Sequence, residues 1–467
     1  MTTLYRYEIF CQTDSRVESV WATTPPTTCP VNSAHLVLLS SIAIIDKNVQ
    51  NSISFGDDSI VDSYDRLKVV ENKNIMNFKQ VYQTNPDIKF ETVALNGATG
   101  TYRPNESLTE LTTSTVINSS IIFQSKDYFM YQAGSSFQII ITALIGAQKT
   151  GSIQELGYFD NNNGIFFRMD GATGLSLVNR TFASGVAVDN IILRNAWNFD
   201  KFDGTGPSTY NLDATKTQFW WIDLQWQGTG RVRVGLFING EAVVCHKFNF
   251  TNTLTTVYMT TPCLPIRFAI RNTAVTASAT TMKAICSSIS IESMTDPTGF
   301  PMSIYTPVLR SVNNAAVGVA NSNFIPVLSI RLKTVFKAKE NRIRIQLDSF
   351  SCILSGNGAT PCVYALILNP VLAGTLVWAD VDTVNSGVEF NINATTATGG
   401  ILINSGFINV ASGFLTVNLD EFLNYSNYPL TLNVAGTLSA ILTLGVKRLI
   451  TGSANDAYGY LGWTEIY

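Results

Sequence analysis

The chain of 467 residues exceeds the roughly 250 residues at which a single hydrophobic core stops growing, so its length predicts two or three domains. Charged residues make up only 14%, and the net charge of −3 comes without a long basic stretch, which argues against nucleic acid as a partner. No apolar run reaches the ~18–20 residues that span a bilayer, and the first residues lack a signal-peptide pattern. We therefore expect no membrane insertion and synthesis in the cytosol.

The first quarter of the chain divides into two parts of different composition. Residues 1–46 hold two short apolar stretches, 5–10 and 36–45, joined by a connector whose three prolines keep it extended. They predict a small N-terminal β cap. Residues 47–118 are polar and weakly periodic, and they offer too little apolar surface to offset the entropy of ordering. We expect an extended arm or linker there.

Strand signals become dense in residues 119–294. Apolar and polar side chains alternate in Phe219–Trp226 and Arg231–Ile238, and Asn239-Gly240 then gives a strong signal for a two-residue hairpin turn. Further strands fit Phe137–Leu144, Gly164–Met169, Pro265–Arg271 and Ala284–Ile291. Their number and spacing predict a β-sandwich or jelly roll.

The interval Ser293–Pro301 gathers proline and glycine and predicts a domain boundary. Residues 302–467 contain short β-branched runs separated by Gly, Asn and Thr, which predict a second sandwich, and only Val417–Tyr425 has a mildly helical pattern. The predicted fold class is therefore all-β, with tandem β-sandwich or jelly-roll domains, a small N-terminal β cap and an extended arm.

Groups that could carry catalysis are few. The seven cysteines form no C-x-x-C pair, so they predict free, mostly buried thiols rather than a zinc site or a disulfide framework. No phosphate loop, nucleophile elbow or zinc-protease motif occurs. If Asn239-Gly240 is a two-residue turn, His246 lies opposite Arg233 as an ordinary surface residue, with a satisfied core position as the other interpretation. We expect no catalytic residue, no metal or cofactor requirement and no enzymatic activity.

Four residues are candidates for contact with a glycan or a partner. Asp160 and Asn161 lie in one loop rich in oxygen ligands, and Asp203 lies in another. Calcium prefers several such oxygens together, but the same residues also form ordinary turns, which is the favoured interpretation. Trp221 lies on the polar face of its strand. There it would stack on a sugar ring, anchor a partner or be covered by the arm of the same chain.

Three carboxylates are candidates for the acid pair of a polysaccharide-degrading enzyme, namely Glu155, Asp160 and Asp223. The sequence does not show that any two of them converge. A cross-strand ion pair with Arg231 or Arg233 is the simpler interpretation of Asp223.

Several motifs resemble modules of virion structural proteins. The opening, including Val20-Trp-Ala-Thr-Thr-Pro-Pro-Thr-Thr-Cys-Pro30, looks like the N-terminal module of such proteins in large DNA viruses. The central motifs are similar to a module found in giant viruses and some tailed phages, and they include Gly157-Tyr-Phe-Asp160, Gly164-Ile-Phe-Phe-Arg-Met-Asp-Gly171 and Gly228-Thr-Gly-Arg-Val-Arg-Val-Gly235. The resemblance implies a virion component with a lectin-like jelly roll at 119–294, and it transfers no catalytic residue.

The first hypothesis is a minor capsid, penton or vertex-associated protein that assembles with other virion proteins. A homo-oligomer, trimer or pentamer, would cover the sheet edges that a flat and weakly charged β protein exposes. The alternative is a carbohydrate- or receptor-binding fibre or spike head that binds a host surface glycan.

Overall fold

The structure is a computed structural model, and its contacts divide the chain into two compact units, Met1–Gly56 and Asp57–Tyr467. Apart from one short 3-10 helix, Arg194–Ala196, the described elements are β-strands, which confirms the all-β class. The described residues are 4–11, 13, 15–22, 24–28, 37–48, 73–82, 89–292, 299–312, 323–356, 360–409, 414–418, 430–450 and 455–467. Among them, no helix has the length and apolar character needed to cross a membrane.

The first unit holds a three-stranded antiparallel sheet of order β2-β1-β3. Its strands are β1 (Leu4–Cys11), β2 (Arg16–Ala22) and β3 (Val37–Asn48). The two apolar stretches predicted for the cap thus form β1 and β3, and the segment between them supplies β2. Tyr7 and Cys11 are buried in this sheet.

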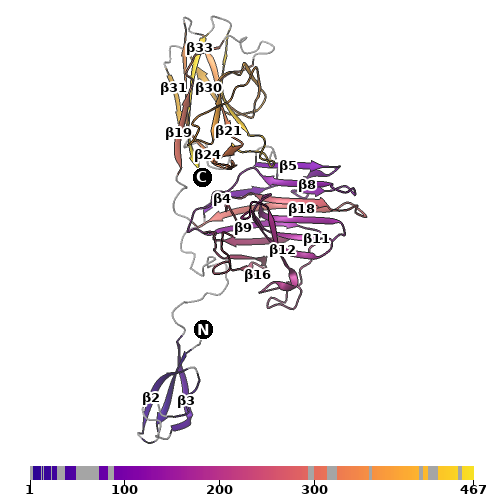
Figure 1. Ribbon diagram of the computed structural model, residues 1–467, viewed down its shortest axis with the longest axis vertical. Helices are drawn as coiled ribbons and strands as arrows, with labels where there is room; N and C mark the ends of the chain where they lie inside the picture. Colours follow the sequence, from indigo (N-terminus) through magenta and orange to yellow (C-terminus); the bar gives the residue numbers. More distant parts are fainter. Residues whose placement is uncertain are drawn as a thin grey trace. The chain divides into compact units, whose positions relative to one another are not determined.

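The described residues 73–292 of the second unit form the central sandwich, whose two antiparallel sheets pack face to face (Figure 1). One sheet has seven strands in the order β13-β12-β11-β10-β17-β8-β5, with the bounds β5 Phe90–Leu95, β8 Ser120–Ser125, β10 Ser152–Phe159, β11 Gly164–Asp170, β12 Gly174–Thr181, β13 Val188–Leu193 and β17 Ile266–Asn272. The other has the order β16-β15-β14-β9-β18-β7-β6, and β4 also pairs with β18. Its strands are β4 Lys73–Lys79, β6 Thr99–Arg103, β7 Leu108–Thr112, β9 Phe137–Leu144, β14 Gln218–Leu224, β15 Val232–Ile238, β16 Glu241–Phe248 and β18 Thr281–Ile291.

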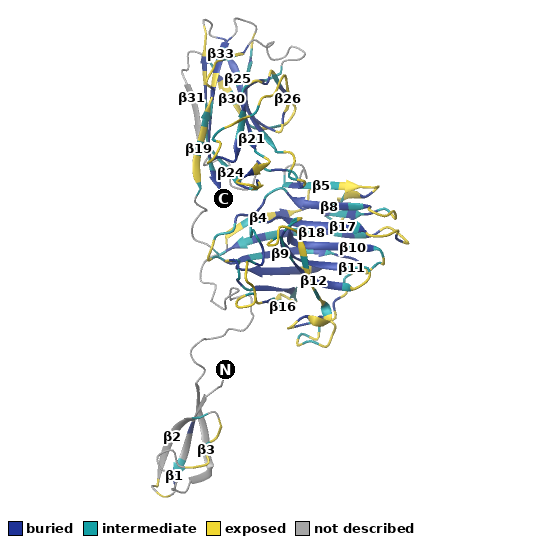
Figure 2. Ribbon diagram, viewed as in Figure 1, coloured by how far each residue is buried: buried dark blue, intermediate teal, exposed yellow. Residues whose placement is uncertain are grey.

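One hydrophobic core fills the space between these two sheets. The inward-pointing side chains of both sheets form this core, because every second side chain of a strand points to the same face. Leu156, Phe167 and Phe268 come from the seven-stranded sheet, and Ile139 and Trp220 come from the eight-stranded one; all are at most 1% exposed. Figure 2 shows the strands in the middle of both sheets as mostly buried and the connecting loops as largely exposed.

The extended arm predicted at 47–118 does not hold for the described residues of that range. Strands β4 to β7 lie within it, and they belong to the sheets of the central sandwich. Their short apolar pieces are buried by partners far along the chain: β4 and β7 both pair with β18, and Phe78 and Phe90 lie in the core. A local count of apolar residues underestimates burial that comes from such distant pairing.

The hairpin β15–β16 turns at Asn239-Gly240, as predicted, with positive φ at both residues. A β-bulge then shifts the register between Val234 and Gly235. As a result Lys247, rather than His246, lies opposite Arg233, and the predicted neighbour of His246 is wrong by one residue. The bulge accompanies Gly235, because a Cβ there would clash with the carbonyl oxygen of Val243.

The described residues 299–467 form the C-terminal sandwich, again with one buried core between two main sheets. Its sheets have the orders β19-β33-β24-β31, with β20 also paired to β33, and β27-β28-β21-β32-β25-β30. The strands are β19 Phe300–Tyr305, β20 Arg310–Val312, β21 Ile325–Leu332, β24 Arg344–Ser355, β25 Cys362–Leu368, β27 Ala379–Asp380, β28 Val388–Asn391, β30 Ile401–Ile408, β31 Phe414–Asn418, β32 Ile441–Arg448 and β33 Asn455–Ile466. Two small two-stranded sheets complete it, β22 Val335–Phe336 with β23 Lys339–Glu340 and β26 Val371–Ala373 with β29 Thr396–Thr398. The mildly helical pattern at Val417–Tyr425 starts in β31, and its residues 419–425 lie outside the described residues.

Candidate functional site

The outer face of the seven-stranded sheet carries a layer of arginine and phenylalanine side chains. On β11, Ile165 and Phe167 point into the core, so Phe166 and Arg168 point outward. The same alternation brings Phe159 of β10, Arg180 of β12 and Arg267 of β17 to this face. We call these five residues, Phe159, Phe166, Arg168, Arg180 and Arg267, the arginine–phenylalanine layer.

Two glycines make room for the phenyl rings of this layer. Gly164 lies opposite Phe159, and Gly157 lies opposite Phe166; a Cβ at either glycine would clash with the phenylalanine beside it. The two rings therefore lie close to the sheet and stack on each other, with centroids 4.1 Å apart. Arg180 lies over both rings at 5.0 and 5.8 Å, which buries two aromatic side chains on a face that would otherwise expose them.

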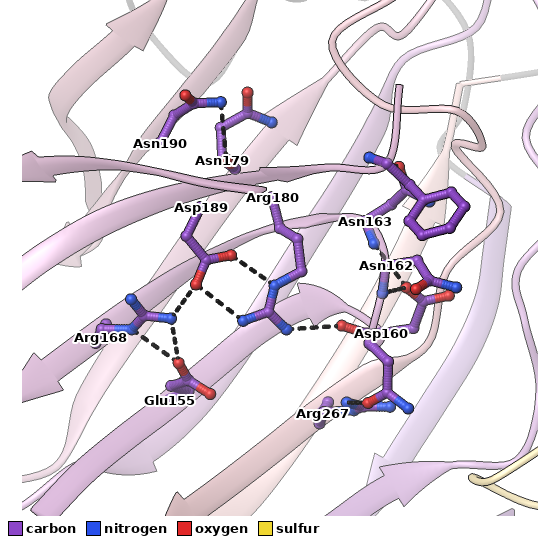
Figure 3. Close-up of polar contacts among 12 residues, drawn as sticks. Glu155, Asp160, Asn162, Asn163, Arg168, Asn179, Arg180, Asp189, Asn190 and Arg267 are labelled. Atoms are coloured by element: carbon purple, nitrogen blue, oxygen red, sulfur yellow. Dashed lines mark hydrogen bonds and ion pairs between the residues drawn. The ribbon is translucent and has the colours of Figure 1, made fainter. Parts of the chain in front are cut away.

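Ion pairs fix the charged groups of the layer (Figure 3). Arg168 Nη2 contacts Glu155 Oε1 at 2.6 Å and Asp189 Oδ2 at 2.5 Å, and Arg180 Nε contacts Asp189 Oδ1 at 2.7 Å. Arg271 adds a longer contact of 3.5 Å to Glu155. Burial alone would raise the pKa of Asp189, but the hydrogen bonds from Arg180 and Arg168 outweigh it and lower that pKa below its ordinary value.

Loops at one end of the sheet are tied to the same layer. Asp160 Oδ1 accepts hydrogen bonds from the backbone N–H groups of Asn162 and Asn163 at 2.7 and 2.8 Å, and the Asp160 carbonyl accepts one from Arg180 at 3.0 Å. Asn161 Oδ1 accepts a hydrogen bond from Arg267 Nη1 at 2.6 Å.

The buried Asn163 connects three loops of this end, because its side chain bonds the backbone N–H groups of both Phe182 and Thr260. Its Nδ2 also donates to Thr260 Oγ1 at 2.9 Å. The polar groups are thus positioned before any ligand arrives.

Of the four predicted contact residues, the structure brings together Asp160 and Asn161 only. Asp203 lies in the exposed loop before β14, where its Oδ1 accepts hydrogen bonds from the N–H and hydroxyl of Thr205 in an ordinary turn. Trp221 belongs to the eight-stranded sheet and is 0% exposed. Of the alternatives for Trp221, contact with a sugar or a partner is therefore wrong, and the side chain is covered within its own chain.

Trp221 is buried together with a charged pair. Arg233 lies over its ring at 5.3 Å, and Phe237 meets it edge-on at 6.0 Å. Asp223 accepts a hydrogen bond from Arg233 Nε at 3.1 Å and one from Ser136 Oγ at 2.7 Å. The predicted cross-strand pair Asp223–Arg233 is confirmed, but both side chains are fully buried instead of solvent-facing.

His246 is a buried residue, 7% exposed, and its Nδ1 accepts a hydrogen bond from the Asn198 N–H at 3.3 Å. Burial lowers its pKa to about 4. In the unfolded chain the imidazole of His246 is protonated below about pH 6.5, whereas in the folded protein it stays neutral until about pH 4. Protonation therefore favours the unfolded chain, so stability is unaffected above pH 6.5 and falls as the pH decreases toward 4.

We therefore expect the titration of His246 alone to lower the free energy of unfolding by about 1–2 kcal/mol between pH 7 and pH 4.5. Urea unfolding of the natural protein and of His246→Gln, at a series of pH values, measures this decrease. A difference between the two proteins that does not vary with pH would contradict the assignment.

The acidic groups of the described residues do not form a metal site, since no three His, Cys, Asp or Glu side chains gather there. The carboxylates proposed for catalysis do not converge either. Glu155 lies in the middle of β10, Asp160 lies in the loop after this strand, and Asp223 is on the other sheet. The six described cysteines, all but Cys29, are free, as predicted.

Sequence reasoning missed most of this site. Arg168, Arg180, Asp189 and Arg267 were not singled out, although alternation in β11 already places Phe166 and Arg168 on the face opposite the core. The glycines of the motifs Gly157-Tyr-Phe-Asp160 and Gly164-Ile-Phe-Phe-Arg were the other available signal.

No family model and no curated protein matches this sequence. Solved structures similar to the chain include the carbohydrate recognition domain of Emp47p, with 12% identity over 47% of this chain and 96% of that one and a TM-score of 0.29. The legume lectin-like domain from Entamoeba histolytica has 10% identity over 46% and 97%, with a TM-score of 0.28. The CBM2 module of the evolved Dit of Lactobacillus casei BL23 phage J-1 has 9% identity over 49% and 98%, with a TM-score of 0.29. Each of these structures aligns with about half of the chain, and similarity this low does not determine what the chain binds.

Proposed function

We propose that this protein is a non-catalytic recognition protein whose central sandwich binds carbohydrate on the outer face of the seven-stranded sheet. The observation that carries the proposal is the set of charged groups held there by ion pairs yet partly open to solvent: Arg180, Asp189 and Arg271 have side chains that are 13%, 24% and 42% exposed. Rigid polar groups lose little conformational freedom on binding, which favours hydrogen bonding to weakly held ligands such as sugars.

Apolar side chains flank these polar groups on the same face. Ile191 and Leu193 of β13 lie opposite Val178 and Ser176 in the register of β12, and they are 47% and 39% exposed. A sugar ring presents hydroxyl groups at its rim and C–H groups on its faces, so it needs both kinds of contact. The outer face supplies them side by side.

The same geometry supports binding without hydrolysis. Arg168 lies between Glu155 and Asp189 and contacts both carboxylates through one nitrogen, where a glycosidic oxygen would have to lie. Hydrolysis also needs one protonated carboxyl as the acid. Asp189 cannot serve at neutral pH, because its ion pairs lower its pKa.

A glycan array probed with the purified chain, with calcium and with a chelator, tests the proposal. We expect hits that do not depend on calcium, and calorimetry with a soluble hit gives the affinity. Arg271→Gln should weaken that affinity about tenfold by removing an exposed donor from this face, a loss of ~1.4 kcal/mol. The matched control is Arg103→Gln, an equally exposed arginine of the eight-stranded sheet whose partner is Glu110. An array without hits, or equal losses in both variants, would contradict the proposal.

A second candidate function is assembly in a virus particle. The sequence resemblance to virion structural proteins supports it, and so does β30, the terminal strand of its sheet. This strand contains no charged residue, and its Leu402 and Phe407 are 57% and 76% exposed, so an assembly partner would protect it. Detection of this chain among the coat proteins of purified particles is the direct test.

A further inference from the structure

The seven-stranded sheet ends at β13, which has no strand neighbour on its other side among the described residues. Proteins usually protect such an edge with lysine, proline or a bulge. β13 has none of these: its sequence is Val-Asp-Asn-Ile-Ile-Leu, and its register with β12 runs without interruption from Ser176↔Leu193 to Thr181↔Val188. Its backbone is therefore in position to pair with a further strand, apart from the Ile192 carbonyl oxygen, which already accepts a hydrogen bond from Trp197 Nε1 at 3.2 Å.

The side chains along this edge are unusually apolar for an exposed strand. Val188, Ile191 and Leu193 are 44%, 47% and 39% exposed; Ile191 and Leu193 lie on the outer face of the strand and Val188 lies on the opposite face. The one charged residue, Asp189, is already paired with Arg168 and Arg180. Bringing two such edges together would bury apolar surface without opposing two free carboxylates.

We propose that β13 pairs in antiparallel orientation with β13 of a second copy of this chain, so that two seven-stranded sheets become one continuous sheet. The second copy is the occupant that fits best, because an edge whose outer face is apolar at Ile191 and Leu193, and whose single charge is neutralised, is complementary to itself. Such a contact is isologous about a two-fold axis. Pairing centred on Ile191 brings the two Ile191 side chains together on the outer face. It gives a dimer, in contrast to the trimer or pentamer expected from the sequence.

The pairing has a consequence for recognition, which rests on the proposed function. Antiparallel pairing at an edge keeps the outer faces of both sheets on the same side. The two arginine–phenylalanine layers would then face a glycan-coated surface together, and two weak sites would act as one stronger bivalent one.

Light scattering behind a sizing column, at about 20 µM of the full chain, tests the pairing. We expect twice the chain mass of 51.1 kDa for the natural protein and the single-chain mass for Ile191→Lys, which places a charge at the centre of the interface. The matched control is Ala94→Lys, an exposed position on β5 at the opposite edge of the same sheet, which should remain dimeric. A single-chain mass for the natural protein, or an unchanged oligomer of any size in Ile191→Lys, would overturn the proposal.

Two further measurements keep the test decisive. If Ile191→Lys does not fold, Ile191→Cys under mild oxidation should form a disulfide-linked dimer on a non-reducing gel, beyond the background of the natural protein; no such dimer overturns the pairing. Calorimetry of the natural protein with a single-site oligosaccharide separates the two proposals; Ile191→Lys is not used for it, because Ile191 also belongs to the proposed carbohydrate-binding face. If β13 does not pair, calorimetry should still give the affinity of one site. If the chain does not bind carbohydrate, light scattering should still give the mass of the dimer.

Discussion

Arg168→Met is expected to lower the free energy of unfolding by about 3–5 kcal/mol and to abolish the proposed carbohydrate binding on the outer face. Arg168 and Glu155 have side chains only 6% and 5% exposed, so removing the guanidinium leaves a carboxylate in a nearly dry environment. It also removes one of the two arginines that hold Asp189 on β13. Urea unfolding measures the first effect, and calorimetry with a glycan from the array measures the second.

A conservative variant and a matched control sharpen this expectation. Arg168→Lys retains the charge but cannot hold two carboxylates with a planar group, so it should recover part of the stability and little of the binding. Arg103→Met removes the arginine of the exposed pair Arg103–Glu110 and should leave the free energy of unfolding almost unchanged. Equal losses in Arg168→Met and Arg103→Met would show that the ion pairs of the outer face do not hold the site together.

Arg233→Met is expected to destabilise the central sandwich by a similar amount, about 3–5 kcal/mol, with no direct effect on the outer face of the seven-stranded sheet. Asp223 and Arg233 are both 0% exposed, and the variant leaves the Asp223 carboxylate with Ser136 but without its cation. The arginine also covers the ring of Trp221, and that packing is lost as well.

The double variant Arg233→Met, Asp223→Leu distinguishes the charge from the packing. If desolvation of Asp223 is the main cost, the double variant should be more stable than Arg233→Met by several kcal/mol. Unfolding in urea, followed by tryptophan fluorescence, gives both values. A double variant no more stable than Arg233→Met would show that packing against Trp221, and not the charge, sets the stability of this face.

Local patterns in the sequence predicted the elements of the fold well. Alternation from Phe219 onward located β14 and its core face, and Asn239-Gly240 located the β15–β16 turn. Burial of both faces was not predictable in this way. For Trp221 an open stacking surface and a position covered by the arm of the same chain stayed alternatives, because alternation tells which face a residue occupies but not what covers that face.

The candidate site was only partly predictable, because its parts come from separate strands. The loop residues Asp160 and Asn161 were found by composition, since turn residues also carry oxygen ligands. Asp189 lies in a segment without a distinctive motif, and it joins Arg168 only through the register of β11, β12 and β13. One residue of slip in either pairing would separate them.

The position of β18 in the middle of its sheet has a consequence for synthesis on the ribosome. β18 joins β4, β7 and β9, and Gln80 Nε2 donates to the Ala284 carbonyl oxygen 204 residues further on. At ~5–20 residues per second, the early strands would wait roughly 10–40 s for this partner. During that time β9 lacks one of its neighbours, so nascent chains of this protein would depend on chaperones until residue 291 has left the exit tunnel.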